Sequence, residues 1–259
     1  SFGGSEKKER FQSFTCKSMK KFIPFILIII ISLFITLLWF RQGKIMGAGE
    51  SGLIFYDLDS QFQLAKFSWG DPGLGNSLGI GVAASPTYWF FSRVQNIGVP
   101  APVVQAIFFA IIFCVAGFSV YFLTKEFFPQ LEEKFIFLAV LFYWFNPLSM
   151  VNVWNRFLYN YMVFWALLPL ASFLFIRGLI KKDFRYAIFT SVSTMVFSFA
   201  LTSIPFNLIL WFLFFYTALF FICILRQNIR FILEYFCLSL VSFIFLNFWW
   251  ISQTFSFIS

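Results

Sequence analysis

Long runs of apolar residues with hardly a charge inside them constrain this chain more than any other feature of its sequence. A helix that crosses a bilayer needs about 20 predominantly apolar residues. Seven stretches meet this criterion, over residues 22–40, 103–123, 135–151, 161–180, 186–204, 206–225 and 231–250. The first is too long for the core of a cleaved signal peptide, and no small-residue cleavage site follows it. The sequence therefore predicts an all-α integral membrane protein with about seven transmembrane helices.

Composition excludes a soluble enzyme. Of the 259 residues, 60% are hydrophobic, 24% aromatic and only 12% charged, whereas a soluble domain is about 45–50% apolar. The absence of His removes Ser-His-Asp and Cys-His catalysis and HExxH zinc sites. The four Cys form no CxxC pair, so neither a metal site nor a disulfide framework is indicated.

Basic residues gather in alternate loops. The first 21 residues and the loops after the second, fourth and sixth spans hold 14 of the 19 Lys and Arg. Because cytoplasmic flanks are enriched in these residues, we expect a multi-pass plasma-membrane protein with its N-terminus in the cytoplasm. The same asymmetry explains the net charge of +8, and no nucleic-acid partner is expected. The chain then divides into a basic cytoplasmic tail, 1–21, and one membrane module, 22–259, which we interpret as a piece of a longer protein.

The loop over residues 41–102 differs sharply in composition from the spans. It holds ten of the 14 Gly, four of the nine Pro and four of the 11 acids. Loops of this length tend to be functional. Its sequence predicts one short helix capped by Asp57 or Asp59, and another with Ser85 as its N-cap, Pro86 at its first position and Gly98 as its stop. Both are too short to span a bilayer, so we expect juxtamembrane helices at the level of the lipid headgroups of the extracytoplasmic face.

The arrangement resembles a known family. The loop reads GE at 49–50, YDLD at 56–59, KFSWGDPGLG at 66–75 and SP at 85–86. A long acid-bearing outer loop after the first span, followed by six spans, is similar to the membrane module of GT-C-type glycosyltransferases, and the loop text resembles large arabinofuranosyltransferase-type members. The resemblance implies transfer of a sugar from a polyprenyl-phosphate donor to a glycan, glycolipid or protein acceptor on the extracytoplasmic face. The paired Asp-Glu of protein mannosyltransferases is absent here.

Inverting glycosyl transfer needs a base that takes the proton of the acceptor hydroxyl. Without His, an outer-face carboxylate is the natural base, and Glu50 is the first candidate because the resemblance places an acid there. The alternative for Glu50 is a solvated loop carboxylate. Asp57 and Asp59 would assist as base, or would bind a divalent cation such as Mg or Mn together with Glu50; the alternative is helix capping. Asp71 precedes Pro72 and Gly73, a sequence typical of a turn, so we expect a structural role for it.

Cations and aromatic rings complete the predicted site. Arg156 is the candidate for the donor phosphate, because its forked donors match phosphate oxygens. Lys44 and Arg93 are weaker candidates, and all three have lipid headgroups as the alternative partner. The aromatic residues that could stack on sugar rings are Trp69, Trp89, Trp154 and Tyr159, with membership of an interfacial aromatic belt as the alternative.

A non-catalytic membrane protein is the competing class: a transporter or flippase for lipid-linked glycans, or an assembly subunit. Glu234 is the one acid inside a span, and such a group is a functional candidate by default. Arg230 lies four residues earlier, so we expect an ion pair on the helix surface instead.

Overall fold

The computed structural model describes residues 4–47, 54–67, 69–70, 76–77 and 79–255. Within them the chain is helical apart from one antiparallel pair of two-residue strands, β1 (Trp69–Gly70) and β2 (Asn76–Ser77). Six described segments are long and apolar enough to cross a membrane: Phe22–Phe40, Ala101–Phe127, Glu133–Asn155, Tyr159–Lys181, Ile204–Cys223 and Ile229–Thr254. The described residues thus form the all-α, multi-pass type of fold that the sequence predicts.

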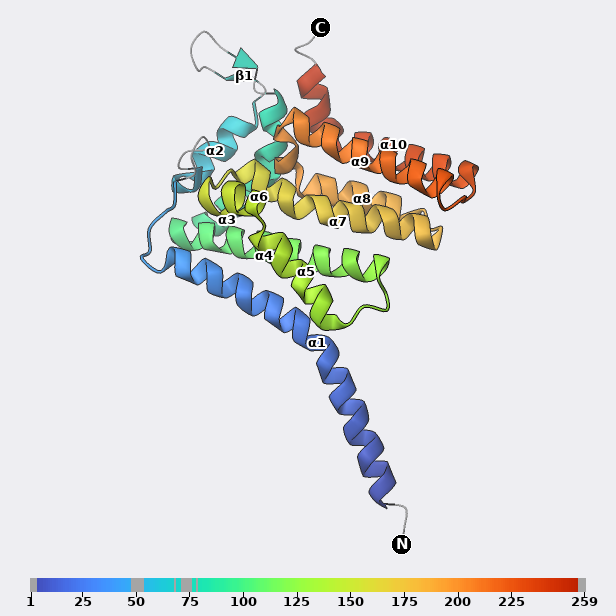
Figure 1. The fold of residues 1–259 in the computed structure, drawn as a ribbon. Coiled ribbons are helices and arrows are strands. Elements are labelled where there is room, and N and C mark those ends of the chain that lie inside the picture. Colours follow the sequence, from blue (N-terminus) through green and yellow to red (C-terminus); the bar gives the residue numbers. More distant parts are fainter. Residues whose placement is uncertain (1–3, 48–53, 68, 71–75, 78, 256–259) are drawn as a thin grey trace.

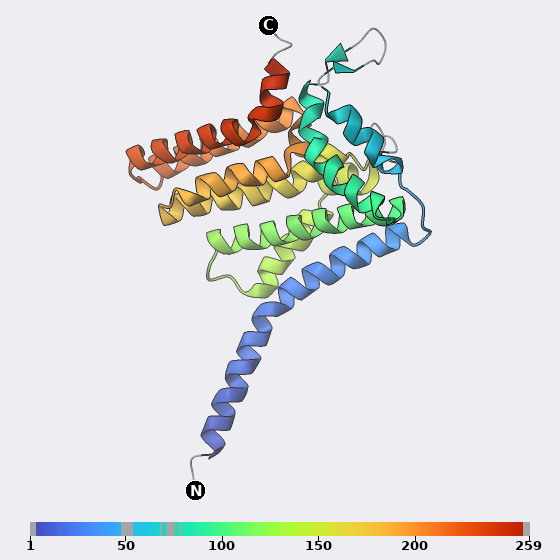
Figure 2. The ribbon, with the colours of Figure 1, turned by 180° about the vertical axis from the view of Figure 1, so that it is seen from behind.

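The long helices lie side by side in a bundle (Figure 1). They are α1 (Gly4–Phe40), α4 (Ala101–Phe127), α5 (Glu133–Phe145), α7 (Tyr159–Lys181), α9 (Ile204–Cys223) and α10 (Ile229–Phe255). The turns that join α4 to α5, α7 to α8 and α9 to α10 lie at one end, which we call the turn end (Figure 2). The first half of α1 projects away from the bundle. The long loop lies at the opposite end, which we call the loop end.

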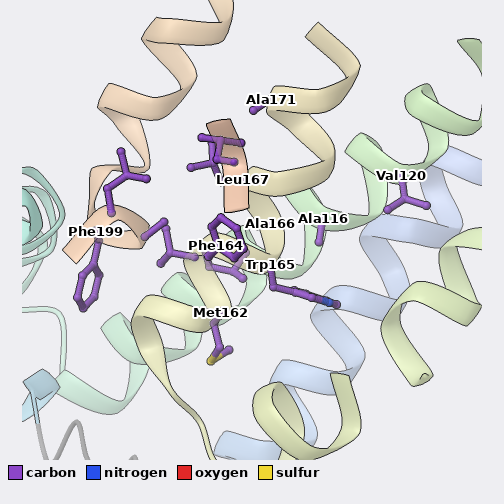
Figure 3. Packing of buried hydrophobic residues seen from close by; sticks show 14 of the residues in the cluster. Ala116, Val120, Met162, Phe164, Trp165, Ala166, Leu167, Ala171 and Phe199 are labelled. Carbon is purple, nitrogen blue, oxygen red and sulfur yellow. The ribbon is translucent and has the colours of Figure 1, made fainter. Parts of the chain in front are cut away.

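Helix α7 is the core of the bundle. Of its most apolar 18-residue stretch 72% is buried, against 50% or less for the other five segments. Helix α7 packs against α4. Small residues of both helices, Ala116 on α4 and Ala166 and Ala171 on α7, are fully buried (Figure 3). Small side chains let helix backbones approach closely, which is how helices associate where lipid is the solvent.

Two glycines take this close approach further. A Cβ at Gly117 of α4 would lie 2.6 Å from the ring of Trp144 and 2.8 Å from Ile28, so α1, α4 and α5 meet at this point. A Cβ at Gly178 of α7 would lie 2.5 Å from the ring of Tyr235 and 2.7 Å from Tyr186. A hydrogen in place of a methyl group is what allows both contacts.

The predicted span over 186–204 is not one continuous helix. The structure has α8 (Arg185–Val196) followed by a 3-10 helix, η5 (Ser198–Thr202), so the described residues contain six long apolar helices rather than seven. Hydroxyl side chains cluster just before the break: Ser191, Ser193 and Thr194 are buried and donate to carbonyls three or four residues earlier. Such bonds compete with the helical ladder and favour a break.

The segment after α5 also departs from a plain helix. Asn146 precedes Pro147 and is extended, with ψ 158°, so α5 ends at Phe145. A short turn, α6 (Pro147–Ser149), and a π-helix, η4 (Met150–Asn155), lead on to α7. Pro147 is the first residue of α6 and Pro205 the second of α9, so both stand where a helix starts rather than inside one, whereas Pro169 lies inside α7.

Short helices cover the loop end. They are η2 (Ile54–Tyr56), α2 (Leu58–Ala65), η3 (Gly79–Ala84) and α3 (Ser85–Asn96). The side chain of Gln95 fastens α3 to α2: its carbonyl oxygen accepts from the amide of Leu58 at 3.2 Å, and its amide donates to the carbonyl of Tyr56 at 3.3 Å. Ser85 is the first residue of α3 and not its N-cap, which is Ala84. Gly98, with φ +94°, follows α3 and stops it, as predicted.

A buried amide ties the loop to the core. Gln105 of α4 is fully buried; it accepts from the amide of Met46 at 2.9 Å and donates to the carbonyl of Met46 at 2.8 Å and to the hydroxyl of Tyr159 at 2.7 Å. Gln105 thus forms a hydrogen bond between α4 and α7. Asn247 of α10 likewise donates to Thr194 of α8, at 3.2 Å.

Replacing Gln105 by Leu should lower the free energy of unfolding by about 2 kcal/mol, because it leaves the buried amide of Met46 without an acceptor. The thermal unfolding midpoint in detergent would measure this loss. Gln63, which is exposed on α2, offers the matched control: Gln63→Leu should leave the midpoint unchanged. Equal midpoints for the two variants would show that the amide bridge adds no net stability.

Candidate functional site

The loop end brings together parts of the chain that are far apart in the sequence. η3 packs against η5 and α10, and α3 packs against α2 and α4. One buried hydrogen bond, from the hydroxyl of Ser198 to the carbonyl of Ala83 at 2.6 Å, joins η5 to η3. The broken helix thus forms one wall of the region in which sequence analysis places the site.

Of the three candidate acids, the structure describes two. Glu50 lies outside the described residues, as does Asp71. Asp57 is the N-cap of α2: its carboxylate accepts from the amide of Ser60 at 3.0 Å and from the hydroxyl of Ser60 at 2.6 Å. Asp59 is exposed in the first turn of α2, where the helix dipole favours an acid. Asp57 therefore has the capping role that sequence analysis left open.

The cap makes α2 sensitive to acid. The hydroxyl and then the amide of Ser60 hold the pKa of Asp57 below its ordinary value of 3.8. A depressed pKa stabilises the helix above the unfolded value, and this contribution is lost as the pH falls through the folded value. We expect the hydrogen-exchange protection of the Ser60 amide to drop below about pH 4. Asp57→Asn, which caps without titrating, should remove that pH dependence; its persistence in the variant would show that another group causes it.

A metal site receives no support from the described acids. Among the residues that the structure describes, no three His, Cys, Asp or Glu side chains lie close enough together to hold a metal ion. The proposed cation site of Glu50, Asp57 and Asp59 includes a residue outside them. Each carboxylate oxygen of Asp57 already accepts a hydrogen bond from Ser60.

The three candidate cations lie on different elements of the loop end. Arg156 is exposed where η4 ends, next to Phe157, whose φ is +48°. Lys44 is exposed just after α1. Arg93 is exposed on α3, three and four residues after Phe90 and Trp89, so the three share a face of that helix.

Two of the candidate aromatic residues belong to the core. Trp154 donates its indole N–H to the carbonyl of Trp144 at 2.8 Å, and its ring packs 5.0 Å from that of Trp39. Tyr159 is fully buried, with its hydroxyl on Gln105. Only Trp89, which is 48% exposed, presents its ring at an opening among the candidates whose side chains are described. The side chain of Trp69 lies outside the described residues.

That opening is an apolar cavity of about 460 Å³. Five parts of the chain surround it: α3, α4, α7, the junction of α8 with η5, and α10. Its walls are almost wholly hydrocarbon, and the lining residues include Trp89, Phe90, Ile111, Val196, Phe197 and Trp249. Because Arg93 lies on the same face of α3 as Trp89 and Phe90, the cavity has a cation beside it.

A second, more polar hollow of about 250 Å³ lies on the other face of α3. Tyr88, Asn160 and Thr202 bring polar groups to it, and Ile54 lines its side. Burial, with a smaller effect of Tyr159, raises the pKa of the Tyr88 phenol to about 12, so Tyr88 is a neutral hydrogen-bond donor at pH 7. The first turns of α3 therefore separate an apolar compartment from a polar one.

Sequence analysis missed most of this wall. The hydroxyl cluster over residues 190–194 was the available signal that the fifth predicted span would break and expose Val196 and Phe197. Nothing in the local pattern distinguishes Asn160 or Tyr88, since each lies among aromatic residues of a kind found all along the chain.

Comparisons with known protein families, curated proteins and solved structures gave no match to this chain.

Proposed function

We propose that this chain is the membrane module of a glycosyltransferase that takes its sugar from a polyprenyl-phosphate donor. The observation that carries the proposal is the pair of compartments on the two faces of α3. A lipid-borne donor needs an apolar space for its chain and an adjoining polar space for its sugar, with a cation for the phosphate between them. Arg93, on the face of α3 that carries Trp89 and Phe90, has the charge for that role.

The orientation follows from the basic residues. The N-terminal tail and the turn end carry most of the Lys and Arg, whereas the loop end carries few. By the positive-inside rule the turn end faces the cytoplasm and the compartments face outward. In this topology α8 and η5 together make a seventh crossing, from the turn end back to the start of α9. Its broken backbone would be shielded by α7 and α10, as membranes require of irregular segments.

In the proposed reaction the acceptor hydroxyl attacks the anomeric carbon and the donor phosphate leaves, with inversion. Glu50 takes the proton of the acceptor hydroxyl. The guanidinium of Arg93 or Arg156 stabilises the charge on the departing phosphate. Tyr88, kept neutral, donates a hydrogen bond to a sugar oxygen, and Trp89 offers a ring to the first isoprene units. Asp59 retains its assisting role beside Glu50, while Asp57 holds α2 in place.

A photoreactive polyprenyl phosphate, with a diazirine on the prenyl chain, would test the cavity. We expect it to label peptides from α3 and the α8–η5 junction in protein reconstituted in nanodiscs. Val196→Trp, which fills the cavity, should reduce this labelling about tenfold, the effect of roughly 1.4 kcal/mol in binding. Val192 lies one turn earlier on α8, is exposed and does not line the cavity. Val192→Trp is therefore the matched control.

Two results would contradict the assignment. Equal labelling of the two tryptophan variants would show that the prenyl chain does not enter the cavity. A shallow apolar groove on the surface of α5 is lined by Phe135, Leu138 and Phe142. Labelling confined to this groove would show that the probe only dissolves in the surrounding lipid.

The competing function, a carrier for lipid-linked glycans, would use the same cavity. It predicts dependence on a charge within the spans, whereas Glu234 already forms the predicted ion pair with Arg230 at 2.8 Å. Labelling alone does not separate the two functions; the response of sugar transfer to Glu50, considered in the Discussion, does.

A further inference from the structure

A third cavity lies at the turn end of the bundle, remote from the compartments of the proposed transfer reaction. It measures about 260 Å³ and is lined by Phe122 of α4, Phe173 and Arg177 of α7, and Tyr186 of α8. Three rings and one guanidinium therefore form its walls. The side chain of Arg177 is 30% exposed, so its charge is only partly solvated.

The protein leaves Arg177 incompletely bonded. Its Nε donates to the hydroxyl of Tyr186 at 3.1 Å, and one terminal nitrogen donates to Glu126 at 3.4 Å. The second distance is long for a charge-assisted bond, which is usually 2.7–2.9 Å. A guanidinium has five N–H donors, and within the described part of the chain these two bonds are the ones that it makes. The remaining donors can bind an anion in the cavity.

The charges around the cavity favour that anion. Each nearby acid already has a basic partner: Glu126 has Arg177, Glu133 has Lys125 at 2.6 Å, and Asp183 has Arg185 at 2.8 Å. Lys181 and Lys182 add positive charge, and Lys181 lies 5.9 Å from the ring of Tyr186. The surroundings of the cavity thus carry a surplus of positive charge after the acids are paired.

The cavity lies within reach of the lipid headgroup layer. Arg177 lies four residues before the end of the apolar segment Tyr159–Lys181, about 6 Å along the helix, so its long side chain can extend to the headgroups. A bilayer with a hydrocarbon core of about 30 Å and a total of 40–45 Å leaves roughly 5–8 Å for each headgroup layer. The two phenylalanine walls suit the glycerol and the first methylenes of a lipid, whereas a soluble anion gains nothing from them.

We propose that this cavity binds the phosphate of an anionic phospholipid, with Arg177 as its principal ligand. Tyr186 positions the guanidinium, Lys181 and Lys182 attract the negative headgroup, and Phe122 and Phe173 contact the glycerol region. The chemistry shared with a soluble phosphate is the phosphate group itself. The site is independent of the proposed transfer reaction, because it lies at the opposite end of the bundle.

Native mass spectrometry would test this. Protein is released from nanodiscs of phosphatidylcholine and phosphatidylglycerol, and the ratio of the two lipids that stay bound is measured. We expect wild-type protein to retain phosphatidylglycerol preferentially, and Arg177→Gln to reduce that preference about tenfold, as befits loss of a charge-assisted pair of bonds. Arg226→Gln is the control, since it removes the same charge from an exposed site in the turn between α9 and α10.

Second variants guard against a folding defect. Tyr186→Phe keeps every charge but frees the guanidinium, and should reduce the preference by a few-fold with an unchanged unfolding midpoint. Arg177→Lys should retain more of the preference than Arg177→Gln. Equal losses in Arg177→Gln and Arg226→Gln, or no preference in the wild type, would overturn the proposal. So would protection of the wild type against unfolding by inorganic phosphate in pure phosphatidylcholine nanodiscs, which would assign the site to a soluble anion.

Discussion

Glu50→Gln is expected to reduce sugar transfer by a factor of about 10²–10⁴, the usual contribution of a general base. The substitution keeps the shape and the hydrogen-bonding length of the side chain and removes only its ability to take a proton. Transfer from a radiolabelled polyprenyl-phosphate sugar in vesicles would measure the loss. In the wild type the rate at limiting acceptor should rise with pH through the pKa of the base, and the variant should lack this rise.

The controls separate catalysis from folding and from binding. Glu132→Gln makes the same chemical change at the turn end, where Glu132 pairs with Lys134 at 2.8 Å, and should transfer sugar at the wild-type rate. Photolabelling of the apolar cavity by the prenyl probe should be the same in Glu50→Gln as in the wild type. Wild-type turnover by the variant would remove Glu50 from the mechanism.

The same measurement distinguishes the competing function. A carrier for lipid-linked glycans should be insensitive to loss of a base in the outer loop and sensitive to Glu234→Gln. The proposed transferase should show the reverse, because the ion pair between Arg230 and Glu234 lies on an exposed surface of α10 and carries no chemistry.

Gly178→Ala is expected to destabilise the helix bundle. A methyl group there would press on the hydroxyl and ring of Tyr235, which is fully buried, and on the Cβ of Tyr186, so α7 would have to move away from both α8 and α10. Overpacking of this kind costs about 1–3 kcal/mol. Alanine favours an isolated helix over glycine by about 1 kcal/mol, so a net loss would show that the clash outweighs helix propensity.

A double-mutant cycle tests the cause. Tyr235→Leu removes the ring that the new methyl group meets, at the cost of a cavity. The double variant Gly178→Ala with Tyr235→Leu should lose less free energy of unfolding than the sum of the two single variants, with a coupling of about 1–3 kcal/mol. Strict additivity, measured as unfolding midpoints in detergent, would show that Gly178→Ala acts through something other than its contact with Tyr235.

Some features of the site followed from local chemistry and could be predicted. Asp57 caps α2 because a carboxylate at that position can reach the free amides of a helix start. The Arg230–Glu234 pair follows from a spacing of four residues on a helix.

Other features depended on packing that local patterns do not encode. Trp154 and Tyr159 have the composition of an interfacial aromatic belt, but their neighbours place them in the core, against Trp39 and Gln105. The span over 186–204 is apolar enough on average, yet its helix ends at Val196, shortly after a cluster of buried hydroxyls. A hydropathy average over a segment contains no information about which carbonyl a hydroxyl side chain bonds.

By itself, the sequence determined that the chain is helical and suited to lipid, because backbone groups in lipid must bond within their own segment and apolar length alone then selects helices. Only the tertiary structure decided that the first turns of α3 separate an apolar cavity from a polar one, and that Arg177 faces a cavity of its own. These arrangements join residues as far apart as Trp89 and Trp249. Such contacts depend on how whole helices pack, and the pattern within any one helix leaves that packing open.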